Sequence, residues 1–156
     1  MPFSNQNWAK FYGFFFTALA AFLLLDRWLK NIILEGFSFR GECASLVFAL
    51  NEGVAFSMFA FLGDHLKWIQ LGLLGLILAY VIYERYLRDY PLAVALVMAG
   101  GIGNIYDRFV HGGVVDYIYW HCGFEFAIFN LADVMINVAV AILLIKLLLP
   151  AKEQRL

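Results

Sequence analysis

Four aspartates stand out because they interrupt or flank apolar stretches of the sequence: Asp26, Asp107, Asp116 and Asp133. A charged side chain near the centre of a bilayer costs at least about 2.5–3.5 kcal/mol and is normally directed toward a partner. Two carboxylates held together at low dielectric cannot both ionise easily, so such a pair shares one proton. The ionised member can take a proton from water while the neutral member donates one to a carbonyl oxygen. Metal-free hydrolysis of an amide bond is therefore the chemistry that these residues could perform.

The four aspartates differ in their local surroundings. Asp26 precedes Lys30 by four residues, which is the favourable arrangement for an ion pair on a helix. Asp107 is followed directly by an arginine, so it has a structural interpretation too. Asp116 and Asp133 have no obvious local cation, and Asp133 lies within an apolar stretch. These two are the candidates for chemistry, although the sequence alone does not show that they are close.

Four apolar stretches must position these residues. Of the 156 residues 63% are apolar and 15% are charged, whereas soluble domains are roughly 45–50% apolar. We expect one integral membrane domain over residues 1–156, mainly α, with four transmembrane helices and a small extracytoplasmic β-containing segment. Each uncharged core is shorter than the about 20 residues that a span needs, so the spans extend into flanking polar residues. The predicted spans are approximately 8–34, 66–85, 91–108 and 130–149, and the outer segments are 35–65 and 109–129.

The distribution of Lys and Arg predicts the orientation of the bundle. With four spans, the two termini and the loop between the second and third spans share one side, which holds a small excess of Lys and Arg. The positive-inside rule makes that side cytoplasmic. All four aspartates then gather at the outer boundary of the membrane. The Lys and Arg residues form no basic patch, so we expect no nucleic-acid partner.

Spacing on the predicted helices brings further polar residues to the same boundary. Asn104, Asp107 and Arg108 share one face of the third span, and Asn130, Asp133 and Asn137 share one face of the fourth, where Asn130 caps the helix. Small residues before the first group, Gly100, Gly101 and Gly103, would let a neighbouring helix or a substrate approach closely.

The outer segments contain strand patterns, two cysteines and isolated histidines. Residues 37–40 and 45–50 are rich in strand formers, and a further strand should follow the glycine pair at 112–113. Cys43 and Cys122 both lie outside, where a disulfide is permitted, but the sequence leaves their pairing open. The histidines show no ligand spacing, so we expect no metal site.

Five blocks of sequence together resemble a known family. They occur in order along the chain: Asp26-x-x-x-Lys30; Asn51-Glu-Gly53-Val-Ala-Phe-Ser57; Gly100-Gly-Ile-Gly103-Asn104-Ile-Tyr-Asp107-Arg108; Val114-Val-Asp116-Tyr117; and Phe129-Asn130-Leu-Ala132-Asp133. The chain resembles lipoprotein signal peptidase (signal peptidase II), an aspartic peptidase family of the bacterial inner membrane. One block alone would be weak evidence, whereas five in order are specific.

The resemblance implies a function and a site. Asp116 and Asp133 would be the catalytic pair. Other residues would bind substrate or support the site: Asn51, Gly53, Gly100, Asn104, Asp107, Arg108, Asn130, Ala132, Asp26 and Lys30. The substrate would be a prolipoprotein, cleaved before its diacylglyceryl-modified cysteine without a cofactor, within the lipids of the inner (plasma) membrane. Globomycin-type cyclic peptides would inhibit the enzyme, both termini would be cytoplasmic, and residues 51–59 could cover the substrate.

Three other interpretations of the aspartates were considered. An ion-coupled carrier also uses intramembrane acids, but usually near the midplane and in repeated folds, which this sequence does not show. A presenilin-type protease would require Gly-x-Gly-Asp, whereas this chain has Gly101-Ile-Gly103-Asn104. A purely structural subunit would leave Asp116 and Asp133 without a role.

Overall fold

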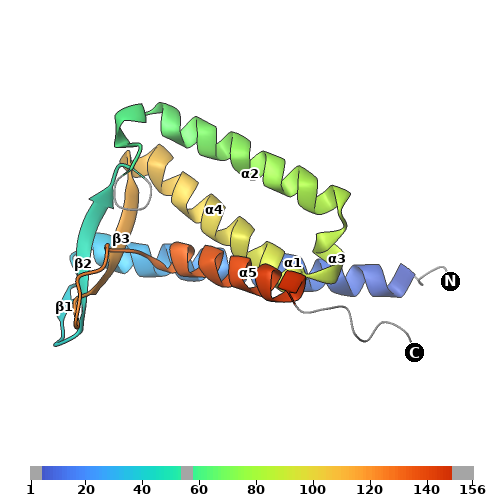
Figure 1. The fold of residues 1–156 in the computed structure, drawn as a ribbon, viewed down its shortest axis with the longest axis horizontal. Coiled ribbons are helices and arrows are strands. Elements are labelled where there is room, and N and C mark those ends of the chain that lie inside the picture. The colour runs from blue at the N-terminus through green and yellow to red at the C-terminus, as the bar shows by residue number, and fades with distance from the viewer. Residues whose placement is uncertain (1–4, 54–57, 149–156) are drawn as a thin grey trace.

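Four long helices, two short helical turns and one small sheet make up the described part of the chain (Figure 1). The computed structural model describes residues 5–53 and 58–148. The elements in chain order are α1 (Asn5–Leu34), β1 (Phe39–Arg40), β2 (Ala44–Asn51), the 3₁₀ helix η2 (Ala60–Leu62), α2 (His65–Tyr83), α3 (Tyr86–Asp89), α4 (Pro91–His111), β3 (Val114–Trp120) and α5 (Leu131–Leu148). The long helices lie within a few residues of the four predicted spans.

Helix α4 is the centre of the bundle, because α1, α2 and α5 each pack against it. Its glycines make the close packing possible. A Cβ atom at Gly100 would lie 2.5 Å from the carbonyl oxygen of Ala132 on α5, and one at Gly103 would lie 2.6 Å from Oδ2 of Asp26 on α1. The predicted close approach of neighbouring helices at these glycines is therefore confirmed.

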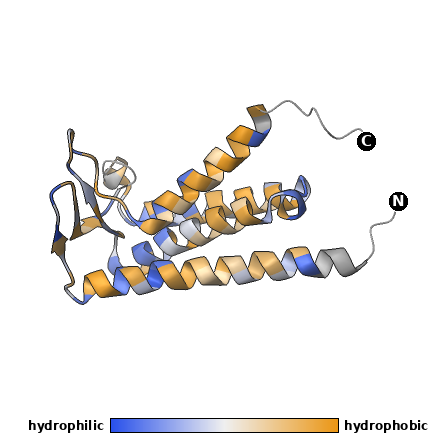
Figure 2. Ribbon diagram, turned by 90° about the horizontal axis from the view of Figure 1, so that it is seen from below, coloured by the Kyte–Doolittle hydropathy of each residue, from blue (hydrophilic) through white to orange (hydrophobic). Residues whose placement is uncertain are grey.

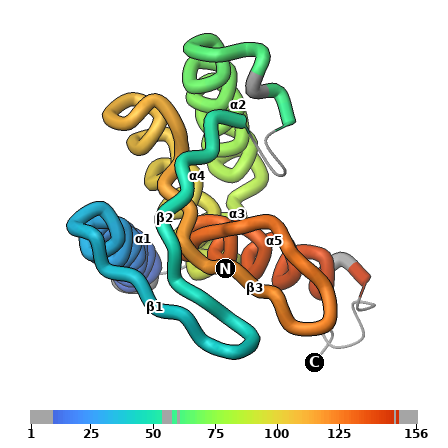
Figure 3. Tube along the Cα trace, turned by 90° about the vertical axis from the view of Figure 1, so that its left-hand side faces the viewer, coloured from blue at the N-terminus to red at the C-terminus, as the bar shows by residue number. Residues whose placement is uncertain are grey.

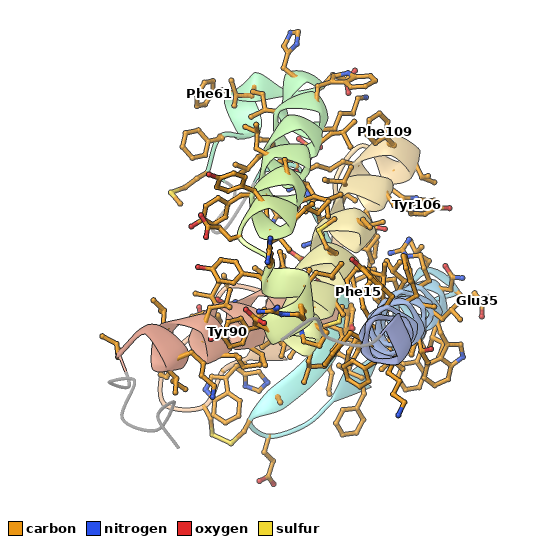
Figure 4. The ribbon with its side chains drawn as sticks, turned by 90° about the vertical axis from the view of Figure 1, so that its right-hand side faces the viewer. Phe15, Glu35, Phe61, Tyr90, Tyr106 and Phe109 are labelled. Carbon is orange, nitrogen blue, oxygen red and sulfur yellow. A yellow bond between two sulfur atoms is a disulfide. The ribbon has the colours of Figure 1, made fainter. Side chains whose placement is uncertain are left out.

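The outside of the bundle is strongly apolar. Large side chains such as Phe16, Leu24 and Leu76 are mostly exposed along the helices, whereas Phe15 is buried. Figure 4 shows Tyr106 and Phe109 on the outside of α4 and Phe15 directed into the bundle. Lys10–Leu34 of α1 and His65–Tyr83 of α2 are long and apolar enough to cross a membrane. That α4 and α5 also cross remains a prediction.

Hydrophilic stretches of the long helices lie at the end of the bundle where the sheet is, and a further hydrophilic stretch at α3 lies at the opposite end (Figure 2). The first residues of α1 and the last residues of α5 lie at the opposite end (Figure 1). Seen from the sheet side, β1, β2 and β3 extend across the ends of the helices (Figure 3). The sheet therefore closes the end of the bundle where these hydrophilic stretches of the long helices lie.

The sheet is antiparallel throughout, in the order β1-β2-β3. This confirms the strands predicted in the first outer segment, within 37–40 and 45–50, and the strand predicted after the glycine pair at 112–113. An irregularity between Leu46 and Ala49 shifts the register of β2 against β3, so that Ala49 lies opposite Asp116. Beyond the ladder, Cys43 and Cys122 form a disulfide, which settles the pairing that the sequence left open.

Candidate active site

Asp116 is held on β3 by two asparagine side chains. Because Ala49 is its cross-strand partner, Asn51, two residues further along β2, presents its side chain on the same face. Nδ2 of Asn51 donates to Oδ2 of Asp116 at 3.0 Å, and Nδ2 of Asn130 donates to Oδ1 at 2.6 Å. The carboxylate is only 2% exposed. Both of its oxygens therefore accept hydrogen bonds from neutral amides in a buried position.

Asp133 is held in the first turn of α5. Its backbone N–H donates to Oδ1 of Asn130 at 2.9 Å, and its Oδ2 accepts the backbone N–H of Asn130 at 3.1 Å. This reciprocal arrangement satisfies two donors at the start of the helix, as a capping box does. Oδ1 of Asp133 accepts Nδ2 of Asn104 on α4 at 2.8 Å. The residue expected to cap the helix thus also fixes the second carboxylate.

Asn130 connects the two aspartates, because its side chain bonds to Asp116 and its backbone and side chain bond to Asp133. Asn130 is completely buried. The segment before it is bound to β3, where Phe129 exchanges backbone hydrogen bonds with Ile118 at 2.7 and 3.1 Å. The hydroxyl of Tyr117 accepts the N–H of Leu131 at 3.2 Å. The start of α5 is therefore fastened to the strand that carries Asp116.

The surroundings of Asp116 change its acidity. Burial raises its pKa to about 6, the negative charge of Asp133 adds to the rise, and the hydrogen bonds from Asn51 and Asn130 oppose it. Burial also raises the pKa of Tyr117 to about 12, so its hydroxyl stays neutral. Asp116 can therefore carry a proton at a pH where an exposed carboxyl would have lost it.

A cavity of about 430 Å³ adjoins the two aspartates. Its lining comes mainly from α2, α4, α5 and the segment before α5: Asn51, Gln70, Leu73, Leu74, Ile77, Val97, Gly101, Asn104, Ile105, Arg108, Val114, Asp116, Phe126, Ala127, Ile128, Phe129, Asp133, Ile136 and Asn137. Most of these residues are apolar, and the polar ones lie toward the sheet. Pockets of this composition bind an apolar ligand and orient it with a few polar groups.

A cluster of four charged side chains lies where α1 meets α4, three of them buried and Arg27 partly exposed. We refer to Asp26, Arg27, Lys30 and Asp107 as the charge cluster. Nζ of Lys30 lies 3.0 Å from Oδ2 of Asp26 and 2.8 Å from Oδ2 of Asp107, and Arg27 lies 2.6 Å from Oδ1 of Asp107. The predicted ion pair between Asp26 and Lys30 is confirmed. Lys30 also donates to Oδ1 of Asn104 at 3.0 Å, which orients the amide that binds Asp133.

The remaining predicted site residues occupy supporting positions. Arg108 donates from Nη2 to the carbonyl oxygen of Gly53 and from Nη1 to that of Asn104, the latter at 3.3 Å. Gly53 is further fixed by its N–H bond to Oδ1 of Asn51 at 3.1 Å. Gly100 and Ala132 meet at the contact of α4 with α5 and are not among the residues that line the cavity. Residues 54–57, which complete the block after Gly53 and belong to the predicted substrate cover, lie outside the described residues.

Two contributors were not identified from the sequence. Arg27 pairs with Asp107, and Tyr117 accepts from α5. The spacing of four residues that predicted the ion pair of Asp26 with Lys30 applies within one helix. It does not predict a contact between Arg27 and a helix far along the chain. Within the described part of the chain, no group of three or more His, Cys, Asp or Glu side chains is arranged to hold a metal ion.

Comparison with known proteins gives a consistent result. A family model described as signal peptidase (SPase) II matches residues 18–149. The lipoprotein signal peptidase of Wolinella succinogenes is 54% identical over 133 residues, which cover 83% of this chain and 91% of the relative. That of Sulfurovum sp. (strain NBC37-1) is 49% identical over 134 residues, covering 86% and 92%. A solved structure of a bacterial membrane enzyme is similar with a TM-score of 0.80 and 26% identity, covering 92% of this chain and 94% of that one.

Proposed function

We propose that this chain, which belongs to the signal peptidase II family, is an aspartic endopeptidase that removes the signal peptide from diacylglyceryl-modified prolipoproteins. Cleavage occurs before the lipidated cysteine. The observation that carries the proposal is the connection of Asp116 to Asp133 through Asn130 beside an apolar cavity. Carboxylates joined in this way suit acid–base catalysis on a substrate that arrives with acyl chains attached.

The reaction needs one proton shared by the two aspartates. The ionised carboxylate takes a proton from water, the water oxygen attacks the scissile carbonyl carbon, and the neutral carboxyl donates its proton to the carbonyl oxygen. Collapse of the tetrahedral intermediate breaks the C–N bond. The leaving amine nitrogen receives the proton that was taken from water, and the carbonyl oxygen returns its own, so the pair ends with one proton as it began.

The surroundings of Asp116 and Asp133 favour different catalytic roles for the two residues. The raised pKa of Asp116, about 6, makes it the better holder of the shared proton. Asp133 accepts N–H groups at the start of α5, where the helix dipole favours negative charge. Asp116 therefore acts as the acid toward the carbonyl oxygen and Asp133 as the base toward water.

The membrane delivers the substrate to this site. In a four-span topology with both termini in the cytoplasm of the inner membrane, the sheet and the aspartates lie at the outer face. A prolipoprotein anchored by its signal helix and two acyl chains presents its cleavage site at that depth. An apolar cavity beside the catalytic pair also suits a globomycin-type cyclic peptide as a competitor for the same space.

Replacement of either aspartate tests the proposal. In purified Asp116→Asn and in purified Asp133→Asn, the turnover of a diacylglyceryl-modified precursor peptide should fall by roughly 10²–10⁴-fold, which is the contribution of proton transfer by a positioned group. Thermal unfolding in the same detergent verifies that the variants are folded. Near-normal turnover by either folded variant would refute the catalytic pair.

A further inference from the structure

Gln70 on α2 is a polar residue without an assigned role beside the cavity. The helix from Trp68 to Tyr83 is otherwise apolar except for two glycines and its tyrosines. Gln70 follows the spacing of Leu73, Leu74 and Ile77, which all line the cavity. Gln70 lies little more than one helical turn from the start of α2. The start of α2 is at the same end of the bundle as the sheet and the two aspartates (Figure 1).

The side-chain oxygen of Gln70 has an unmet requirement. Oε1 is buried and accepts no hydrogen bond from any of the described residues. Leaving a buried acceptor unpaired costs about 1–3 kcal/mol, whereas an apolar side chain of similar shape would avoid that cost. Gln70 therefore does not improve the packing of the empty enzyme, and its amide is available to a ligand.

A peptide bound in the cavity would also need hydrogen-bond partners. A peptide segment that lies extended in an apolar cavity loses water from its N–H and C=O groups, and each group left unpaired costs several kcal/mol. A glutamine amide offers one acceptor and two donors, so it can pair with both the N–H and the C=O of one residue in an extended peptide, because these two groups point to the same side. Rotation about its last side-chain bond is nearly free and exchanges its two ends.

We propose that Gln70 is a substrate-positioning residue that hydrogen-bonds the main chain of the signal peptide close to the cleavage site. The inference rests on the proposed peptidase function. In this arrangement α2 holds the peptide backbone on one side of the cavity, while Asp116 and Asp133 act on the scissile bond from the other. The ester groups of the diacylglyceryl modification, which have no N–H, do not satisfy Oε1.

Binding in an inactive background isolates this contribution. In full-length Asp116→Asn protein, adding Gln70→Leu should raise the Kd of a diacylglyceryl-modified precursor peptide about tenfold, the loss expected for one or two hydrogen bonds. Gln70→Leu alone should unfold at the same temperature as the wild type or higher, because it removes an unpaired polar group. Leu76→Ala, at an exposed position of the same helix, should leave Kd unchanged.

Substrates with an altered backbone identify the partner. A series of precursor peptides in which single amides before the cleavage site become esters removes one N–H at a time. At one position the ester should weaken binding to the Asp116→Asn protein about tenfold and have no further effect in Asp116→Asn/Gln70→Leu. Equal losses in both proteins at every position would overturn the main-chain contact, and a lowered unfolding temperature of Gln70→Leu would indicate a structural role instead.

The two proposals fail in different ways. If wild-type enzyme cleaves the peptide but Gln70→Leu binds it normally, only the role of Gln70 is wrong. If wild-type enzyme does not cleave the peptide while Gln70→Leu still weakens binding in the ester-dependent way, only the catalytic proposal is wrong. Absence of binding by every variant would refute both.

Discussion

Two groups of aspartates lie at the same end of the molecule and are held in different ways; all are buried except Asp133, which is partly exposed. Asp26 and Asp107 in the charge cluster are fully buried and paired with the cations of Lys30 and Arg27. Asp116 and Asp133 are held by the neutral amides of asparagines and by backbone N–H groups. One group is fixed by charge and the other by hydrogen bonds alone.

The two groups differ in whether their carboxylates form ion pairs. Each carboxylate of the charge cluster lies beside a cation, and removing one partner of a buried ion pair is strongly destabilising. The carboxyl group of Asp116 accepts its hydrogen bonds from neutral amides, and burial favours its protonated form, which raises its pKa to about 6. The two groups are joined by Asn104, whose oxygen accepts from Lys30 and whose nitrogen donates to Asp133. Through Asn104, the charge cluster thus helps to position the carboxylate of Asp133.

Removing Lys30 gives the largest expected effect on stability. Lys30→Met leaves the carboxylates of Asp26 and Asp107 without their shared cation, and breaking a buried pair in this way costs about 3–5 kcal/mol. We expect a large fall in the unfolding temperature, measured by thermal denaturation in detergent. Lys67→Met is the matched control, because Lys67 pairs with the exposed Asp64 and such surface pairs contribute about 0–1 kcal/mol.

The unfolding temperatures of Lys30→Met and Lys67→Met test whether the charge cluster has a structural role. Loss of stability by Lys30→Met, together with a folded but inactive Asp116→Asn, would assign the two groups to separate tasks. Equal stability of Lys30→Met and Lys67→Met would contradict the structural role of the charge cluster.

A smaller loss should follow from adding one methyl group at the contact of α4 with α5. Gly100→Ala places its Cβ 2.5 Å from the carbonyl oxygen of Ala132, which is closer than packed atoms can approach, so α5 must shift. Forcing extra atoms into a packed contact costs about 1–3 kcal/mol. Gly72→Ala is the control, since nothing lies within 4 Å of a Cβ there.

The shift of α5 in Gly100→Ala should also lower catalytic activity. Because Asp133 lies one residue beyond Ala132, Gly100→Ala should lower kcat in protein that remains folded, whereas Gly72→Ala should not. Unfolding and turnover of both variants, measured side by side, test this. A Gly100→Ala variant with the stability and kcat of Gly72→Ala would show that the contact can relax without consequence.

The smallest expected effect concerns a single hydrogen bond within the catalytic pair. Asn51 donates to the carboxylate of Asp116 and thereby lowers its pKa. In Asn51→Ala the pKa of Asp116 should rise above its present value of about 6, so the shared proton is retained to higher pH. The alkaline limb of the kcat/KM–pH profile should then move upward by up to about one unit, since one unit corresponds to 1.36 kcal/mol.

A second variant on the same strand provides the control for that shift. Ser45→Ala removes a hydroxyl that lies 3.0 Å from His121, at the other end of β2, and should leave the profile in place. A limb that stays fixed or moves to lower pH in Asn51→Ala would contradict the assignment of the limb to Asp116.

Periodic and local features were predictable from the sequence. Apolar stretches of helical length placed α1, α2, α4 and α5 to within a few residues, and the spacing of Asp26 and Lys30 predicted their ion pair. Contacts between segments far apart in the sequence were not predictable. Nothing in the spacing showed that Cys43 meets Cys122, or that Arg27 meets Asp107.

By itself the sequence determined the apolar helices, the strands and the two aspartates without a local cation, because these depend on neighbours within a few residues. Only the tertiary structure decided that Asp116 and Asp133 are joined through Asn130, that Asn51 reaches Asp116 across a shifted strand register, and that Lys30 orients Asn104. The reason is physical. Hydrogen bonds act over about 3 Å, so the state of a buried carboxylate depends on which distant side chains the packing brings to it.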